Sequence, residues 1–161
     1  MAMSYRHAYV GSVAFGANDN HTVRVFSEAG SYSGPSLIIA YSHCIAHGYD
    51  LKFGLNQQKL AVDSGLWPLY RYDPRLIVQG KPPLQIDSPT PRANVRDYLR
   101  NETRFSMIEK IDPERFRVLS DAAVRNTTER LALYTELASI SFPEVKPPVE
   151  TGPVPSEVKG E

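Results

Sequence analysis

The strongest constraint on the fold is a strand–helix–strand pattern near the start of the chain. Residues 9–16 are rich in β-forming and small residues, which predicts a buried strand. Residues 20–31 follow with helical spacing, and Asn18 or Asn20 is available as the N-cap. Residues 36–41 are almost continuously apolar, as expected of a parallel strand covered on both faces. Together they predict a right-handed βαβ unit.

The following segments extend this unit into a short sheet. Residues 55–63 have a helical pattern, and residues 67–72 predict an aromatic strand that ends at an Asp-Pro pair. Residues 81–89 are extended and rich in proline, so they would make a poor central strand. The fold class is therefore α/β, with a short and mostly parallel sheet. The aromatic side chains of the second segment are expected to pack rather than to stack on a cofactor: Trp67, Tyr70 and Tyr72.

The second half of the chain is helical in character. Residues 95–111 predict one helix, and the order Asp-Pro-Glu at 112–114 favours the start of another that continues to about residue 139. Its apolar positions recur at helical spacing and predict a packed stripe: Phe116, Leu119, Ala123, Leu131, Tyr134 and Ala138. Residues 142–161 are rich in proline and lack apolar periodicity, which predicts a disordered tail.

Composition narrows the classes of partner. The chain has 18 basic and 18 acidic residues, so no net charge favours nucleic acid or an anionic membrane. The longest apolar run, residues 37–41, is far shorter than the roughly 20 residues that cross a bilayer. No hydrophobic segment of a signal peptide follows the first residues, and a single cysteine permits no internal disulfide. These features lead us to expect a cytoplasmic protein.

The single cysteine, Cys44, has the position that most suggests chemistry. It follows the predicted strand 36–41, and open α/β sheets bind ligands at the carboxyl ends of their strands. An iron–sulfur or zinc site needs about four ligands, of which one thiol supplies one. Cys44 is therefore either an inert, buried small residue or part of a larger assembly. We expect its neighbours His43 and His47 to hydrogen-bond the loop or face solvent, because no second pair of ligands is nearby to form a zinc site.

Other polar residues have a functional and a structural interpretation. Asn18, Asp19 and Asn20 could point toward a ligand from a strand-end loop, but such residues more often cap the following helix. Arg71 and Arg75 could bind a phosphate of coenzyme A, but ordinary ion pairing is the preferred interpretation. No Gly-rich phosphate loop and no helical pair of histidines is present in the sequence.

Four ordered stretches of the sequence carry a family resemblance. One is Gly-Ala-Asn-Asp-Asn-His-Thr, and another is the segment around Ser-His-Cys-Ile-Ala-His-Gly; the stretches cover residues 16–22, 34–48, 57–76 and 80–88. They resemble the C-terminal region of pyruvate:ferredoxin (or flavodoxin) oxidoreductase, from Met3 to about Ser120. The resemblance implies an enzyme that uses thiamine diphosphate with magnesium to decarboxylate pyruvate. Such an enzyme passes electrons through four-iron four-sulfur clusters to ferredoxin or flavodoxin and delivers the acetyl group to coenzyme A.

The resemblance also implies how this chain takes part. Residues 1–90 would be the C-terminal part of the thiamine-diphosphate-binding domain, residues 91–141 a helical arm and residues 142–161 a tail. Cys44 would be the last of four cysteine ligands of one cluster, while the other three ligands and the thiamine-binding motif precede this segment. No residue here is assigned a catalytic or thiamine-contacting role.

Two interpretations of the whole chain follow. In the first, it is a fragment or a separately encoded piece of a homodimeric oxidoreductase, inactive without the remainder of the enzyme. In the alternative, it is a non-catalytic interaction subunit that docks onto a partner carrying the thiamine and cluster sites.

Overall fold

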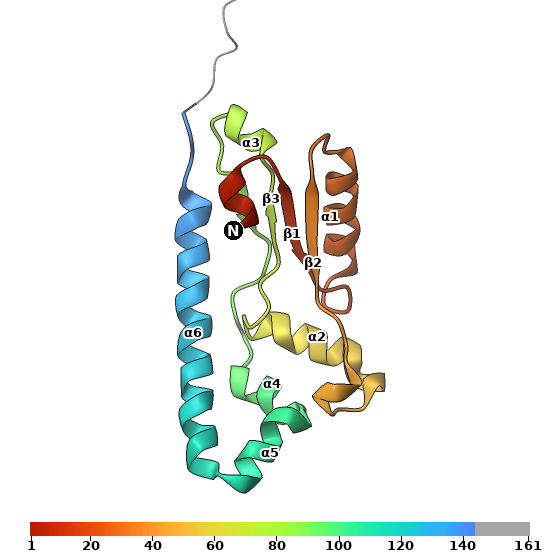
Figure 1. Cartoon of the computed structure of the whole chain (residues 1–161), viewed down its shortest axis with the longest axis vertical. Coiled ribbons are helices and arrows are strands. Elements are labelled where there is room, and N and C mark those ends of the chain that lie inside the picture. The colour runs from red at the N-terminus through yellow and green to blue at the C-terminus, as the bar shows by residue number, and fades with distance from the viewer. Residues whose placement is uncertain (144–161) are drawn as a thin grey trace, which may run out of the picture.

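A four-stranded sheet organises the chain, whose residues 1–143 we describe from a computed structural model (Figure 1). The strands, in spatial order, are β2 (Ser36–Ala40), β1 (Tyr9–Val13), β3 (Tyr70–Tyr72) and β4 (Leu84–Ile86). Helix α1 (Asp19–Ser31) connects β1 to β2, which run parallel in a register from Tyr9–Ser36 to Val13–Ala40. The predicted βαβ arrangement is confirmed.

The sheet is mixed in direction. The α/β class is confirmed, but β3 pairs antiparallel with both β1 and β4, so the prediction of a mostly parallel sheet is wrong. The reason lies in helix α2 (Gly54–Asp63), which sits below the end of the sheet instead of crossing its face, so that the chain turns back into β3 (Figure 1). A return of this kind gives an antiparallel pair, whereas a parallel pair needs a crossover. The segment between β3 and β4 contains the short helix α3 (Arg75–Val78).

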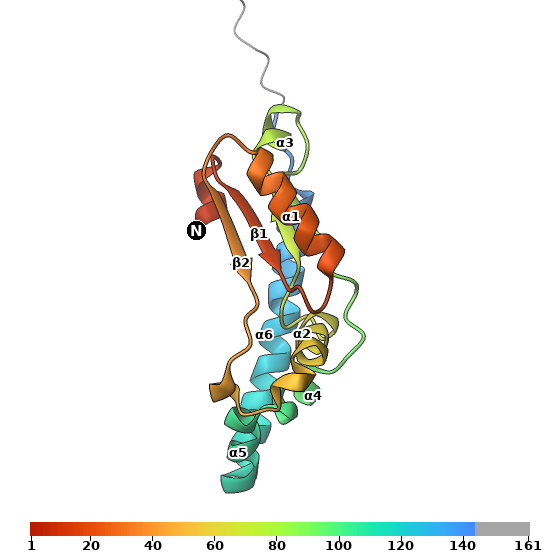
Figure 2. The same ribbon diagram turned by 90° about the vertical axis from the view of Figure 1, so that its right-hand side faces the viewer.

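Helices cover the two faces of the sheet. Helix α1 packs on one face, and the long helix α6 (Pro113–Ser139) runs along the other (Figures 1 and 2). On the α6 face, Tyr134 meets Tyr70 edge to face, with ring centroids 5.6 Å apart. The core on the α1 face contains Tyr9, Val13, Val25 and Ala29, and the core on the α6 face contains Val10, Tyr70, Tyr72 and Leu84. Tyr134 and Ala138 of the predicted stripe therefore pack as expected.

The predicted helix 95–111 is divided in two. Helix α4 (Val95–Asn101) ends before Glu102, whose backbone is extended, and helix α5 (Thr103–Ile111) begins after it. The Glu102 side chain is completely buried, and this tertiary placement overrides the helical propensity of the segment.

Strand β2 is less covered than its sequence predicts. Leu37 is 45% exposed and Ile39 is 38% exposed, so the expectation of burial on both faces is wrong. The physical reason is that β2 ends the strand order and α6 lies over the β3–β4 side of the sheet.

Two further expectations concern the chain ends and membranes. Most of the predicted disordered tail, residues 144–161, lies outside the described residues. Within residues 1–143, no helix has the length and apolar character needed to cross a bilayer.

Candidate functional site

The loop that follows β2 carries Cys44. It leaves the sheet at the carboxyl end of β2, passes through a short 3₁₀ turn (Ile45–His47) and leads into α2. The Cys44 thiol is exposed, so the interpretation of this residue as a buried packing group is wrong. An exposed thiol at a strand end is accessible to a ligand.

His43 anchors the near side of this loop. Its ring packs against the backbone of Gly54, where a Cβ atom would lie 2.6 Å from His43 Nε2. His43 Nδ1 lies 3.4 Å from both the Tyr49 hydroxyl and Gln58 Nε2. The amide oxygen of Gln58 accepts a hydrogen bond from Gly16 N at 2.8 Å. The expected hydrogen bonding of His43 within the loop is confirmed, and it links the loop to the turn between β1 and α1.

The far side of the loop is anchored on α5. Gly48 adopts a left-handed backbone, with φ of 73°, and an added Cβ would lie 2.6 Å from Thr103 Cβ. Both the backbone N–H and the hydroxyl of Thr103 donate to the Gly48 carbonyl, the former at 3.1 Å. His47 N donates to the Cys44 carbonyl at 3.0 Å, while its Nδ1 lies 3.8 Å from Glu102 Oε1. Cys44 is thus held on a turn that is fixed at both ends.

A buried carboxylate, Glu102, lies beneath this anchor. Gln57 Nε2 donates to Glu102 Oε1 at 3.1 Å, and Arg104 Nε donates to Oε2 at 2.6 Å. Burial, together with hydrogen bonds to Tyr41 and Glu102, raises the pKa of Tyr98 well above its usual range. The Tyr41 and Tyr98 hydroxyls lie 2.8 Å apart. Nothing in the sequence singled out Glu102, because Gln57 and His47, which lie against it, come from segments about 45 and more than 50 positions away, respectively.

A pocket of about 270 Å³ opens beside the loop. Its lining combines aromatic rings with two basic side chains: Tyr41, Trp67, Tyr98, His47 and Arg104. Across the described part of the chain, no three His, Cys, Asp or Glu side chains gather to hold a metal ion. The loop therefore presents one exposed thiol on a fixed backbone.

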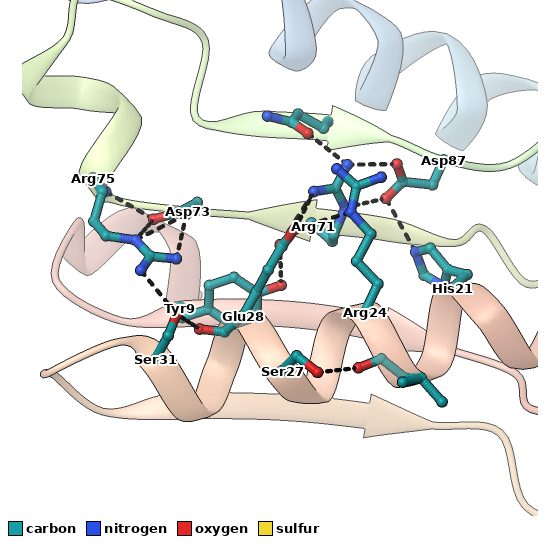
Figure 3. Close-up of polar contacts among 12 residues, drawn as sticks. Tyr9, His21, Arg24, Ser27, Glu28, Ser31, Arg71, Asp73, Arg75 and Asp87 are labelled. Atoms are coloured by element: carbon teal, nitrogen blue, oxygen red, sulfur yellow. Dashed lines mark hydrogen bonds and ion pairs between the residues drawn. The ribbon is translucent and has the colours of Figure 1, made fainter.

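A second polar centre surrounds Arg71 in the middle of β3 (Figure 3). Its guanidinium is almost fully buried and donates to Glu28 Oε1 at 2.8 Å. It also holds Asp87 through two hydrogen bonds of 2.8 and 2.9 Å and donates to Gln85 Oε1 at 2.6 Å. Arg75 forms a separate pair with Asp73 at 2.8 Å. The preferred interpretation of both arginines as ion-pairing residues is confirmed.

Three side chains of neighbouring elements complete this centre: Tyr9, His21 and Arg24, whose Nε donates to Glu28 Oε1 at 3.0 Å. The Tyr9 hydroxyl donates to Glu28 Oε2 at 2.9 Å, and Asp87 Oδ2 accepts from His21 Nε2 at 3.0 Å. Burial alone would raise the pKa of Asp87, but the hydrogen bonds from His21 and Arg71 outweigh burial and hold this pKa at about 2. Burial also opposes ionisation of Glu28, yet hydrogen bonds from Arg71 and Tyr9 leave its pKa below the usual value.

The low pKa of Asp87 predicts a loss of stability in acid. Unfolding returns the carboxyl to its ordinary pKa of about 3.8, so its stabilisation is complete above that pH and disappears as the pH falls toward 2. We expect a loss of about 2 kcal/mol from this group. Urea unfolding at pH 5, 3 and 2 measures it, with Asp87→Asn as the comparison. An equal pH 5-to-2 loss in wild type and Asp87→Asn would contradict the assignment.

The remaining predicted positions have structural roles. Asn18 Oδ1 accepts from His21 N at 2.9 Å, which confirms it as the cap of α1. Tyr70 and Tyr72 are buried in the core, and Trp67 Nε1 donates to the Val13 carbonyl at 3.1 Å. The expectation that these aromatic residues pack is confirmed. Sequence reasoning missed the partners of Arg71; the available signal was a charged residue between two core tyrosines in a strand.

Comparison with known proteins identifies relatives of this chain. No family model matches the chain. The chain is 55% identical, over 141 residues, to the pyruvate-flavodoxin oxidoreductase of Rhodospirillum rubrum, a match covering 88% of this chain and 12% of the relative. It is 52% identical over 139 residues to the enzyme of the same name from Trichormus variabilis, covering 86% of the chain and 12% of that protein.

A pyruvate:ferredoxin oxidoreductase gives the same result. The chain is 44% identical over 138 residues to the pyruvate:ferredoxin oxidoreductase of Moorella thermoacetica, again covering 86% of the chain and 12% of the relative. The chain thus spans about an eighth of the length of the curated relatives it matches. The predicted resemblance is confirmed: over most of its length, this chain is a homologue of one segment of the pyruvate-flavodoxin and pyruvate:ferredoxin oxidoreductases.

Proposed function

We propose that this chain supplies the Cys44-bearing end of the thiamine-diphosphate-binding domain in a pyruvate:ferredoxin or flavodoxin oxidoreductase. The observation that carries the proposal is the 55% identity over 88% of the chain, joined to an exposed thiol on a loop fixed at both ends. The complete enzyme would oxidise and decarboxylate pyruvate, form acetyl-coenzyme A and transfer electrons to ferredoxin or flavodoxin. Residues 1–90 would complete the thiamine domain, and residues 91–141 would form its helical arm.

The described residues fit a four-iron four-sulfur cluster as one contributor. Such a cluster is held by about four thiolates, and the described part of this chain offers one exposed thiol with no further group of ligands around it. The bound cluster would accept and pass on single electrons. The three other thiolates, the magnesium and thiamine diphosphate site and the coenzyme A site would belong to the remainder of the enzyme.

The chain's own contribution is to position the sulfur. His43 packs on Gly54 and Gly48 is bonded to Thr103, so the turn between these anchors has little freedom to move. A ligand on a fixed turn loses less conformational entropy when it binds than a ligand on a loose loop. We propose no general acid or base among these residues. We also propose a cytoplasmic homodimer as the assembly in which the segment works.

A chimeric enzyme tests the proposal. This chain replaces the matching segment of the Rhodospirillum rubrum oxidoreductase, and iron per chain and pyruvate-dependent flavodoxin reduction are measured after anaerobic purification. We expect Cys44→Ala to lose about four iron atoms per chain and to reduce activity at least about 100-fold, because one ligand of a four-iron cluster is missing.

The matched control is Ser42→Ala, an exposed residue of the same loop. This variant should keep the iron content and the activity of the parent chimera. If Cys44→Ala retains both, the ligand role is wrong and the chain acts as a docking module without a part in the redox centre.

A further inference from the structure

Strand β2 has an unpaired edge, although its sequence lacks the residues that usually protect an exposed edge. It ends the strand order β2-β1-β3-β4, and Figure 2 shows no other strand of the described chain beside its outer edge. An edge strand in a soluble protein is usually protected by charged residues or proline. The sequence of β2, Ser-Leu-Ile-Ile-Ala, has neither.

The hydrogen bonds to β1 show which backbone groups of β2 face outward. Tyr9 N donates to the Pro35 carbonyl at 3.0 Å, and Tyr41 N donates to the Val13 carbonyl at 2.9 Å. Alternate residues of a strand turn their backbone groups to opposite sides. The backbone N–H and C=O groups of Leu37 and Ile39 therefore also point toward β1. The N–H and C=O groups of residues 36, 38 and 40 therefore form the open edge.

The side chains of β2 show an apolar face beside this edge. The parallel register places Leu37 next to Val10, on the face of the sheet that α6 covers over β3 and β4. Leu37 and Ile39 lie beyond that cover and are 45% and 38% exposed. A strand of this composition is typical of the interior of a parallel sheet, where a neighbour lies on each side and helices cover both faces.

We propose that a parallel strand from the part of the oxidoreductase outside this chain adds to the open edge of β2. This inference rests on the proposed function, because the chain matches 12% of its relatives' length and the occupant comes from the rest. Parallel strands require a crossover connection, usually a helix. The helix attached to the added strand would cover Leu37 and Ile39. A second copy of this chain is the competing occupant.

The added strand would also affect how firmly the Cys44 thiol is positioned. Cys44 lies four residues beyond the end of β2, at Ala40. A strand held on both edges fixes the start of the Cys44 loop more firmly than a strand held on one edge. The docking of the remaining enzyme and the placement of the cluster ligand are therefore coupled through β2.

Residue-resolved hydrogen exchange tests the proposal on the free 161-residue chain and on the same chimera. We expect the amides of residues 36, 38 and 40 to exchange on the order of 100-fold more slowly in the chimera, while those of Leu37 and Ile39 are protected in both. Equal exchange of the outward amides in the two proteins overturns the proposal. Protection in the free chain that increases with its concentration, together with dimer formation, identifies a second copy and also overturns it.

A pair of variants removes one outward donor. Ala40→Pro deletes the N–H of an exposed residue and leaves the Tyr41–Val13 bond in place, whereas Ala40→Thr keeps the N–H with a side chain of similar size. In the chimera, Ala40→Pro should return the amide of Ile38 to the exchange rate of the free chain, and Ala40→Thr should not. The same slow Ile38 exchange in both variants counts against strand addition.

This result is independent of the iron measurement. Edge protection in a chimera whose iron content does not respond to Cys44→Ala supports the docking surface and refutes the ligand role. Loss of iron in Cys44→Ala, in a chimera whose β2 edge is not protected, supports the ligand role and refutes the docking surface.

Discussion

Replacing Arg71 by methionine should lower the free energy of unfolding by about 3–5 kcal/mol. The Arg71 side chain is 8% exposed and forms ion pairs with both Glu28 and Asp87. Methionine fills much of the same volume but leaves both carboxylates without their buried cation. Urea unfolding at pH 7, where both carboxylates are ionised, measures the loss.

Arg75 provides the matched control for this prediction. It also pairs with an aspartate, Asp73, at 2.8 Å, but its side chain is 40% exposed. Solvent screens such a pair, so Arg75→Met should cost about 1 kcal/mol or less. Losses of equal size in the two variants would show that burial does not set the importance of the Arg71 centre.

Replacing Gly11 by alanine should lower the free energy of unfolding by about 1–3 kcal/mol. A Cβ at this position would lie 2.4 Å from Val25 Cγ1, a contact closer than packed atoms allow. Val25 is completely buried, and a valine in a helix has one strongly preferred rotamer, so α1 itself must move away from the sheet. Thermal or urea unfolding measures the effect.

Two variants give this prediction its controls. Gly30 lies in the same helix with nothing within 4 Å of an added Cβ, so Gly30→Ala should stabilise the protein by about 0.5–1 kcal/mol. Combining Gly11→Ala with Val25→Ala should cost less than the sum of the two single changes, because the second removes the clashing methyl group. Simple additivity of the pair would mean that the clash is not the cause.

The parts of the fold that were predictable depend on neighbouring residues. Apolar runs and helical spacing identified β1, α1 and β2, and Asn18 was recognised as a possible cap because capping acts within three residues. The direction of β3 was not predictable in this way. The pattern of residues 55–63 indicates a helix but does not say whether that helix crosses a face of the sheet or lies at its end.

The same distinction between local and long-range contacts applies to the candidate site. The rule that ligands bind at strand ends pointed to Cys44, whose exposed position agrees with it. The groups that hold its loop are distant in sequence: Thr103 contacts Gly48 across 55 residues, and Glu102 contacts Gln57 across 45. In the second polar centre, Arg71 contacts Glu28 across 43 residues. Such pairs leave no periodic signal in a single sequence. The break in the helix at Glu102 was missed for this reason, since local propensity favours a continuous helix.

The contact between Gly48 and Thr103 determines when the thiol acquires its final surroundings. These residues are separated by 55 positions, so the cysteine leaves the ribosome well before the segment that clamps its turn. Until the helical arm has been synthesised and has packed, the Cys44 loop is anchored only on its His43 side. If Cys44 has the ligand role proposed above, metal loading would be a late event in the biogenesis of this segment, after Thr103 has closed on Gly48.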